Sequence, residues 1–120
     1  MPERKGTLFF KRTQVSVTLP DGTKKSYPLG DVTRIGRGKE NQIPLPEDFK
    51  SISRQHLEIR HEELGYHLFD LGSGNGIAIN GNLVNDALLN DRDEIIIGLS
   101  DMGQQVQVIF QLGTELALSG

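Results

Sequence analysis

Apolar and polar side chains alternate along most of the chain, in short runs bounded by glycine, asparagine, aspartate or proline. Residues 15–19 read Val-Ser-Val-Thr-Leu, residues 20–22 read Pro-Asp-Gly, and Tyr27 and Leu29 follow. A period of two is typical of strands with one buried face, and Pro-Asp-Gly is typical of a turn. The first segment therefore predicts a β-hairpin.

The same alternation predicts seven further short strands. They cover residues 32–35, 43–45, 57–60, 66–70, 77–80, 94–98 and 106–112. No window of a dozen residues keeps the apolar spacing of a helix. Asn75-Gly76 and Asn80-Gly81 favour the mirror-image turns that need positive φ. Many short strands at close spacing predict an all-β sandwich of two sheets.

The length of 120 residues suits one domain. We expect that domain at residues 7–113, with flexible ends or linkers at residues 1–6 and 114–120. The chain has no cysteine, which excludes disulfides, thiolate zinc sites and a cysteine nucleophile and makes the cytoplasm the expected location. No apolar run is long enough for a membrane span, so no membrane insertion is expected.

The formal net charge of −3 argues against general nucleic-acid binding, which depends on neutralising phosphates with Lys and Arg. The charge is uneven, because residues 1–60 hold 12 Lys/Arg and 7 Asp/Glu, whereas residues 61–120 hold one Arg and 9 Asp/Glu. Two interpretations remain open. Either the first half supplies a surface that attracts an anion, or the two halves intermingle in the fold and the difference disappears.

Three glycine-rich or polar segments interrupt the strands, at residues 35–38, 51–56 and 70–76. Loops at one end of a rigid sandwich are common places for binding groups. Small residues there let backbone N–H groups approach a ligand, and Arg37, Ser53 and Asn75 each add a side-chain donor.

These segments, in this order, resemble the forkhead-associated (FHA) domain, a module that binds phosphothreonine peptides. The matching text runs from Arg34 to Gly98 as RIGRGKENQIPL, ISRQHLEI, YHLFDLGSGNGIAING and DRDEIIIG. The resemblance implies an FHA-like sandwich of about eleven strands, with no catalytic activity, cofactor or metal. It implies a module that recognises phosphothreonine-containing partner proteins in kinase-dependent signalling, with other domains of a larger parent protein as further partners.

The resemblance also implies a role for each loop residue. Arg37 and Ser53 would hold the phosphate, Arg54 would add a second cation beside it, and Asn75 would fix the peptide backbone. Gly74 is also counted among the phosphopeptide-binding residues. Gly36, His56 and Gly76 would support the binding loops. These roles suit the ligand, because a phosphothreonine carries about −1.5 to −2 charges and three acceptor oxygens.

Simpler interpretations exist for the same side chains. Arg37 and Arg54 would be solvated surface charges, Ser53 and Asn75 would serve their turns, and His56 would be a hydrogen-bonded core histidine. The chain also departs from the family pattern, with Gly74 in place of the usual Ser or Thr. This departure motivates an alternative function, an FHA-fold module that binds its partner independently of phosphate.

Other functional classes fit the sequence less well. An esterase would join Ser53 or Ser73 with His56 and Asp70, but the chain lacks a Gly-x-Ser-x-Gly elbow between a strand and a helix. Residues 36–40 lack the Gly-Lys-Ser/Thr ending of a phosphate loop. The three histidines have no recognisable metal-ligand spacing.

Overall fold

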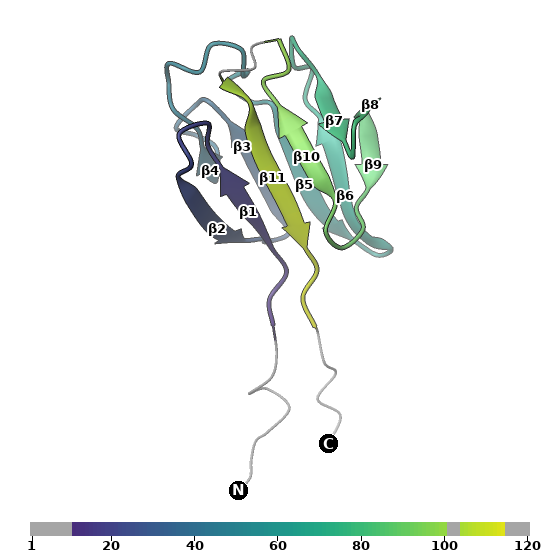
Figure 1. Cartoon of the computed structure of the whole chain (residues 1–120). Helices are drawn as coiled ribbons and strands as arrows, with labels where there is room; N and C mark the ends of the chain where they lie inside the picture. The colour runs from purple at the N-terminus through teal and green to yellow at the C-terminus, as the bar shows by residue number, and fades with distance from the viewer. Residues whose placement is uncertain (1–10, 101–103, 115–120) are drawn as a thin grey trace, which may run out of the picture.

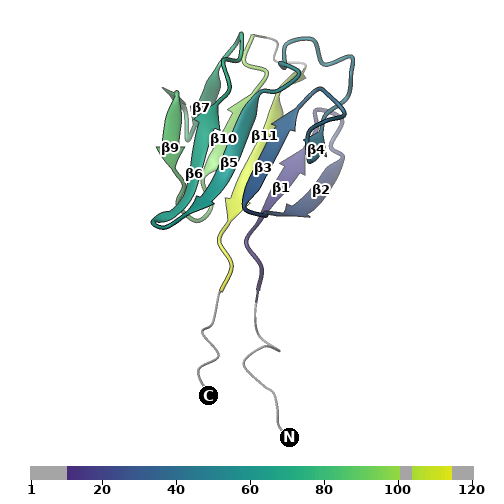
Figure 2. The same ribbon diagram turned by 180° about the vertical axis from the view of Figure 1, so that it is seen from behind.

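The computed structural model describes residues 11–100 and 104–114, which form a sandwich of two sheets (Figures 1 and 2). The six-stranded sheet has the order β2 (Lys24–Pro28), β1 (Gln14–Thr18), β11 (Val106–Gln111), β10 (Glu94–Ile97), β7 (Ile77–Ile79) and β8 (Asn82–Val84). The five-stranded sheet has the order β4 (Ile43–Pro44), β3 (Val32–Gly36), β5 (Leu57–Glu62), β6 (Gly65–Asp70) and β9 (Asp86–Leu88). The prediction of an all-β sandwich is confirmed. Among the described residues, no helix has the length and apolarity needed to cross a membrane.

The core lies between the sheets and follows from the alternation of apolar residues. In β11, Val106, Val108 and Phe110 are fully buried, while the residues between them are half-buried. Val15 of β1 pairs with Phe110 across the central strands of the six-stranded sheet. Burying each such side chain contributes about 1.5–3 kcal/mol, so the sandwich gives the loops a stable base.

Two turns show how local sequence and topology interact. At the β7–β8 hairpin, Ile79 pairs with Asn82, and Asn80 and Gly81 have φ of 51° and 88°. Positive φ at both central residues is the mark of a type I′ turn, as predicted there. The same prediction for Asn75-Gly76 is wrong, because within that pair only Gly76 has positive φ, at 82°. The chain crosses there from β6 to β7 in the other sheet, so no hairpin is closed.

The outer face of the five-stranded sheet holds a buried carboxylate. Glu58 of β5 accepts a hydrogen bond from Arg34 Nε at 2.8 Å and another from Arg60. The Arg60 guanidinium lies over the Phe69 ring, 4.7 Å from its centroid. Burial raises the pKa of Glu58, but the two arginine hydrogen bonds and charges outweigh it, and the net pKa lies below the ordinary value.

The loops after β3, β4 and β6 lie together at the opposite end of the sandwich from the start of β1 and the end of β11 (Figure 1). Lys11 and Thr114 form an isolated bridge just outside β1 and β11. The other residues of the predicted flexible ends, 1–6 and 115–120, lie outside the described residues.

Candidate functional site

The loop after β3 runs beside the end of the loop after β4. The Arg37 N–H donates to the Ser53 carbonyl, and the Gly38 N–H donates to the Arg54 carbonyl, both at 3.0 Å. A Cβ atom at Gly36 would lie 2.2 Å from the Arg54 carbonyl oxygen, well inside van der Waals contact. Glycine is therefore required at position 36 by the close approach of the two backbones.

The Arg37 side chain is held in place by a backbone carbonyl of the β4–β5 loop. Its Nε–H donates to the Ile52 carbonyl at 2.9 Å, and the side chain is only 18% exposed. Its Nη1 lies 3.6 Å from Glu47 Oε1. Because the inner nitrogen is bound to backbone, the terminal nitrogens remain to contact an anion.

Ser53 connects the β4–β5 loop to the β6–β7 loop. Ser53 is half-buried, and its Oγ accepts a hydrogen bond from the Gly74 N–H at 3.2 Å. This contact uses a lone pair of the hydroxyl, and no acceptor for the hydroxyl hydrogen is found among the described residues. The Ser53 hydroxyl can therefore donate to an anion while Gly74 holds it in place.

His56 supports these loops from inside the protein. It is fully buried, its Nδ1 accepts from the Ser53 N–H at 3.1 Å, and its Nε2 donates to the Gly76 carbonyl at 2.8 Å. These two partners require the neutral ring with the proton on Nε2. Burial lowers the pKa of His56 below its ordinary 6.5, although the Gly76 carbonyl and the Asp70 charge act in the opposite direction.

The β6–β7 loop is folded around an aspartate and a serine that sequence analysis considered only as catalytic candidates. Asp70 accepts from the Ser73 N–H at 2.7 Å and from the Ser73 hydroxyl at 3.0 Å. The Ser73 Oγ in turn accepts from the Gly76 N–H at 2.9 Å. Local hydrogen bonds between an aspartate side chain and nearby backbone are a common way to close a loop. It leaves Asn75 exposed, with its Nδ2 donating to the Ser51 carbonyl at 2.8 Å.

Asn41 is a supporting residue that sequence reasoning missed. Its buried amide donates to the Gly38 carbonyl at 2.6 Å and to the Arg54 carbonyl at 2.7 Å. It therefore fixes both loops that carry the arginines. An asparagine in a polar loop has no signal that separates this role from solvent exposure.

Arg54 lies at the rim of the site. Its side chain is 51% exposed, with Nη1 3.1 Å from Glu47 Oε1 and Nη2 3.8 Å from Glu40 Oε1. No backbone carbonyl in the described part of the chain holds its guanidinium. Arg37, Ser53, Arg54 and Gly74 thus belong to one connected surface, with Asn75 beside it on the β6–β7 loop.

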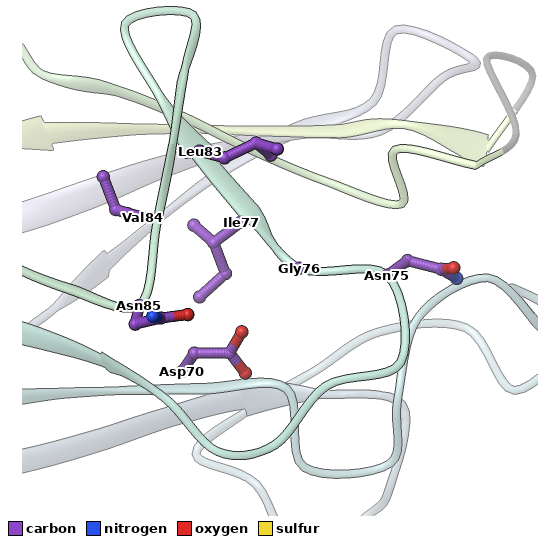
Figure 3. Close-up of a pocket in the computed structure, with 7 residues that line it drawn as sticks. All are labelled: Asp70, Asn75, Gly76, Ile77, Leu83, Val84 and Asn85. Atoms are coloured by element: carbon purple, nitrogen blue, oxygen red, sulfur yellow. The ribbon is translucent and has the colours of Figure 1, made fainter.

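An open pocket lies beside the β6–β7 loop and β8 (Figure 3). Its volume is about 280 Å³, and it is lined by Asp70, Asn75, Gly76, Ile77, Leu83, Val84 and Asn85. The Asn75 side chain points away from the other labelled side chains. Neither arginine lines this pocket, so the cationic surface is a separate feature.

The geometry does not form a serine nucleophile. His56 Nδ1 accepts from the Ser53 backbone N–H, and its Nε2 is bound to a carbonyl, so neither nitrogen is paired with a hydroxyl. Nucleophilic catalysis by serine needs a base within hydrogen-bond reach of the hydroxyl. Among residues 11–100 and 104–114, no group of three or more His, Asp or Glu side chains is placed to hold a metal ion.

Comparison with known proteins identifies the fold family. The FHA domain model matches residues 33–98. The FHA domain-containing protein FhaA of Mycobacterium tuberculosis is 38% identical over 91 residues, which cover 75% of this chain and 17% of FhaA. Glycogen accumulation regulator GarA of the same species is 37% identical over 67 residues, 56% of this chain and 40% of GarA. The chain therefore spans less than half of either relative.

Two solved structures are similar over nearly their whole length. One comes from a structural and functional analysis of phosphothreonine-dependent FHA domain interactions, with 34% identity, a TM-score of 0.69 and coverage of 86% of this chain and 99% of that one. The other is the FhaA FHA domain complexed with the intracellular domain of Rv3910, with 36% identity, a TM-score of 0.64 and coverage of 78% and 98%. The sandwich, the order of the loops and these matches together place the chain in the FHA domain family.

Proposed function

We propose that this FHA domain is a phosphothreonine-binding interaction module, with Arg37 and Ser53 as the principal contacts to the phosphate. The observation that carries the proposal is that two adjacent loops hold a restrained guanidinium and a hydroxyl whose hydrogen has no acceptor within the described part of the chain. Charge-assisted hydrogen bonds of this kind are worth about 1.5–3 kcal/mol each. A few of them, with contacts to the peptide, lead to micromolar affinity, about −8 kcal/mol.

The remaining loop residues have distinct proposed roles. Arg54 adds a second cation at the rim, Gly74 holds the Ser53 hydroxyl, and Asn75 fixes the peptide backbone. Gly36, His56 and Gly76 shape the loops without touching the ligand. FHA domains are interaction modules, and the similar structure solved for phosphothreonine-dependent interactions supports the same class of ligand here.

The test is a phosphothreonine peptide library screened against the purified chain, followed by calorimetry on the peptide that ranks first. The same sequence with phosphoserine and with unmodified threonine provides the matched ligands. We expect phosphothreonine to bind more tightly than phosphoserine, and both far more tightly than threonine. Equal affinity for the unmodified peptide would favour the phosphate-independent alternative.

A further inference from the structure

The two arginines of the proposed site share one acidic neighbour. Glu47 Oε1 lies 3.6 Å from Arg37 Nη1 and 3.1 Å from Arg54 Nη1, so a single carboxylate oxygen bridges both guanidinium groups. Glu40 Oε1 adds a longer contact to Arg54 Nη2, at 3.8 Å. The bridge joins two cations that come from different loops.

We propose that Glu47 is an internal competitor for the ligand phosphate, which sets the affinity of the site by occupying the place of a phosphate oxygen between Arg37 and Arg54. The inference rests on the proposed function, because it assigns the same two arginines to the phosphate. A phosphate that contacts both guanidinium groups must displace the Glu47 carboxylate or share the donors with it. Either event makes the free energy of phosphate binding less favourable.

The surroundings of Glu47 allow it to act in this way. Its side chain is 53% exposed, and within the described part of the chain its carboxylate contacts only the two arginines. A carboxylate with this exposure can turn into water, and an exposed ion pair contributes little to folding. Arg37 keeps its position without Glu47, because its Nε–H remains bound to the Ile52 carbonyl.

The Glu47 carboxylate is a weaker ligand for the two arginines than a phosphate. A carboxylate carries one negative charge, whereas a phosphothreonine carries about −1.5 to −2 charges and three acceptor oxygens. The phosphate therefore wins the exchange, but by less than it would gain at an empty pair of arginines. A glutamate placed in the peptide instead of phosphothreonine would replace one carboxylate with another and gain little.

The experiment compares Glu47→Gln with Asp48→Asn by calorimetry, using the phosphothreonine peptide that ranks first in the library screen. Glutamine keeps the size of the side chain and removes its charge. Asp48→Asn removes the same charge from the next residue, and no ion pair in the described residues joins Asp48 to either arginine. We expect Glu47→Gln to bind about three- to tenfold more tightly than the parent. Asp48→Asn should change the affinity by less than about twofold.

A second pair of variants tests the bridge itself. In an Arg54→Ala background, Glu47 retains only its longer contact with Arg37, so Glu47→Gln should give a smaller gain than in the parent. A denaturant melt of each variant checks that stability is unchanged. An equal gain in both backgrounds would overturn the bridge as its cause.

The outcomes separate this inference from the proposed function. If the parent binds phosphopeptide and Glu47→Gln binds equally or more weakly, Glu47 positions the arginines or is idle, and the competitor role is wrong. A gain shared equally by Asp48→Asn would also overturn it, because the effect would then be general charge. If no phosphothreonine peptide binds the parent, the proposed function itself fails.

Discussion

At the end of the sandwich that carries the loops after β3, β4 and β6, the buried interior and the exposed rim satisfy their polar groups in different ways. Inside, His56 is fully buried and both ring nitrogens are bound to backbone groups of two loops. At the rim, the half-exposed Arg54 guanidinium contacts, among the described residues, only the carboxylates of the exposed Glu40 and Glu47. A buried polar group that loses its hydrogen-bond partner lowers stability strongly, whereas an exposed ion pair contributes little to stability. The interior should therefore determine whether the loops keep their shape, and the rim should determine what they bind.

The largest expected effect is on stability, from His56→Ala. Truncation leaves the Ser53 N–H and the Gly76 carbonyl without partners in a buried place, and each such group costs about 1–3 kcal/mol. We expect the free energy of unfolding to fall by about 2–4 kcal/mol, with weaker phosphopeptide binding as a consequence. A denaturant melt measures the first and a peptide titration the second. Poor binding with a parental melt would assign His56 to the ligand instead.

Arg37→Ala should show the opposite pattern. It removes a charge-assisted contact to the phosphate, so affinity should fall ten- to a hundredfold, about 1.5–3 kcal/mol, while the melt stays close to the parent. Ser53→Ala should behave similarly. Arg54→Ala is the matched control. Because the Arg54 guanidinium is more exposed, its removal should lower the affinity for phosphopeptide less than the removal of Arg37. Parental binding by Arg37→Ala would contradict the assignment of the phosphate to this residue.

Two glycines of the binding loops, Gly36 and Gly74, should respond differently to an added Cβ atom. Gly36→Ala would force a Cβ against the Arg54 carbonyl oxygen, and overpacking of this kind costs about 1–3 kcal/mol. Gly74→Ala places a Cβ where no atom lies within 4 Å, at a residue without positive φ, so its melt should match the parent. Thermal or denaturant unfolding of the two variants checks this difference. Equal destabilisation would mean that the close approach at Gly36 is not limiting.

The smallest effect concerns pH. The pKa of His56 is lowered by burial in the folded state, so below its ordinary value of 6.5 the unfolded chain binds more protons than the folded one. Stability from neutral His56 is therefore complete above about pH 6.5 and is lost as the pH falls toward the folded pKa. Melts between about pH 7.5 and 5.5 should show a steeper loss for the parent than for His56→Gln. Glu58, whose pKa is lowered from 4.5, acts at more acidic pH.

The sequence predicted the central strands and the edge strands β2 and β4, but it missed the edge strands β8 and β9. The alternation in β11 is clear because Val106, Val108 and Phe110 are buried and the residues between them are half-buried, whereas in β1 the polar Ser16 is buried as well as its apolar neighbours. β8 and β9 are three residues each, lie at sheet edges and contain no fully buried side chain, so they carry no alternation to detect. The turn at Asn75-Gly76 was misjudged for a related reason. A dipeptide cannot show whether the next strand joins the same sheet.

The site was predictable to the extent that the family pattern names its residues. Arg37, Ser53 and Asn75 come from that pattern, and the structure describes where each one lies. Glu47 could not be identified in this way, because its importance depends on two side chains from different loops reaching the same oxygen. Asn41 was missed for the same reason, since its partners are carbonyls of two loops.

The placement of β1 and β11 has a mechanical consequence. The two strands are antiparallel neighbours, and the start of one and the end of the other lie side by side, with Gln14 opposite Gln111 and a side-chain hydrogen bond of 2.7 Å between them. A force that pulls the start of β1 away from the end of β11 therefore acts perpendicular to the two strands. It breaks the hydrogen bonds between β1 and β11 one pair of residues at a time. The sandwich would unzip from this end under tension, while the loops at the far end would feel the load last.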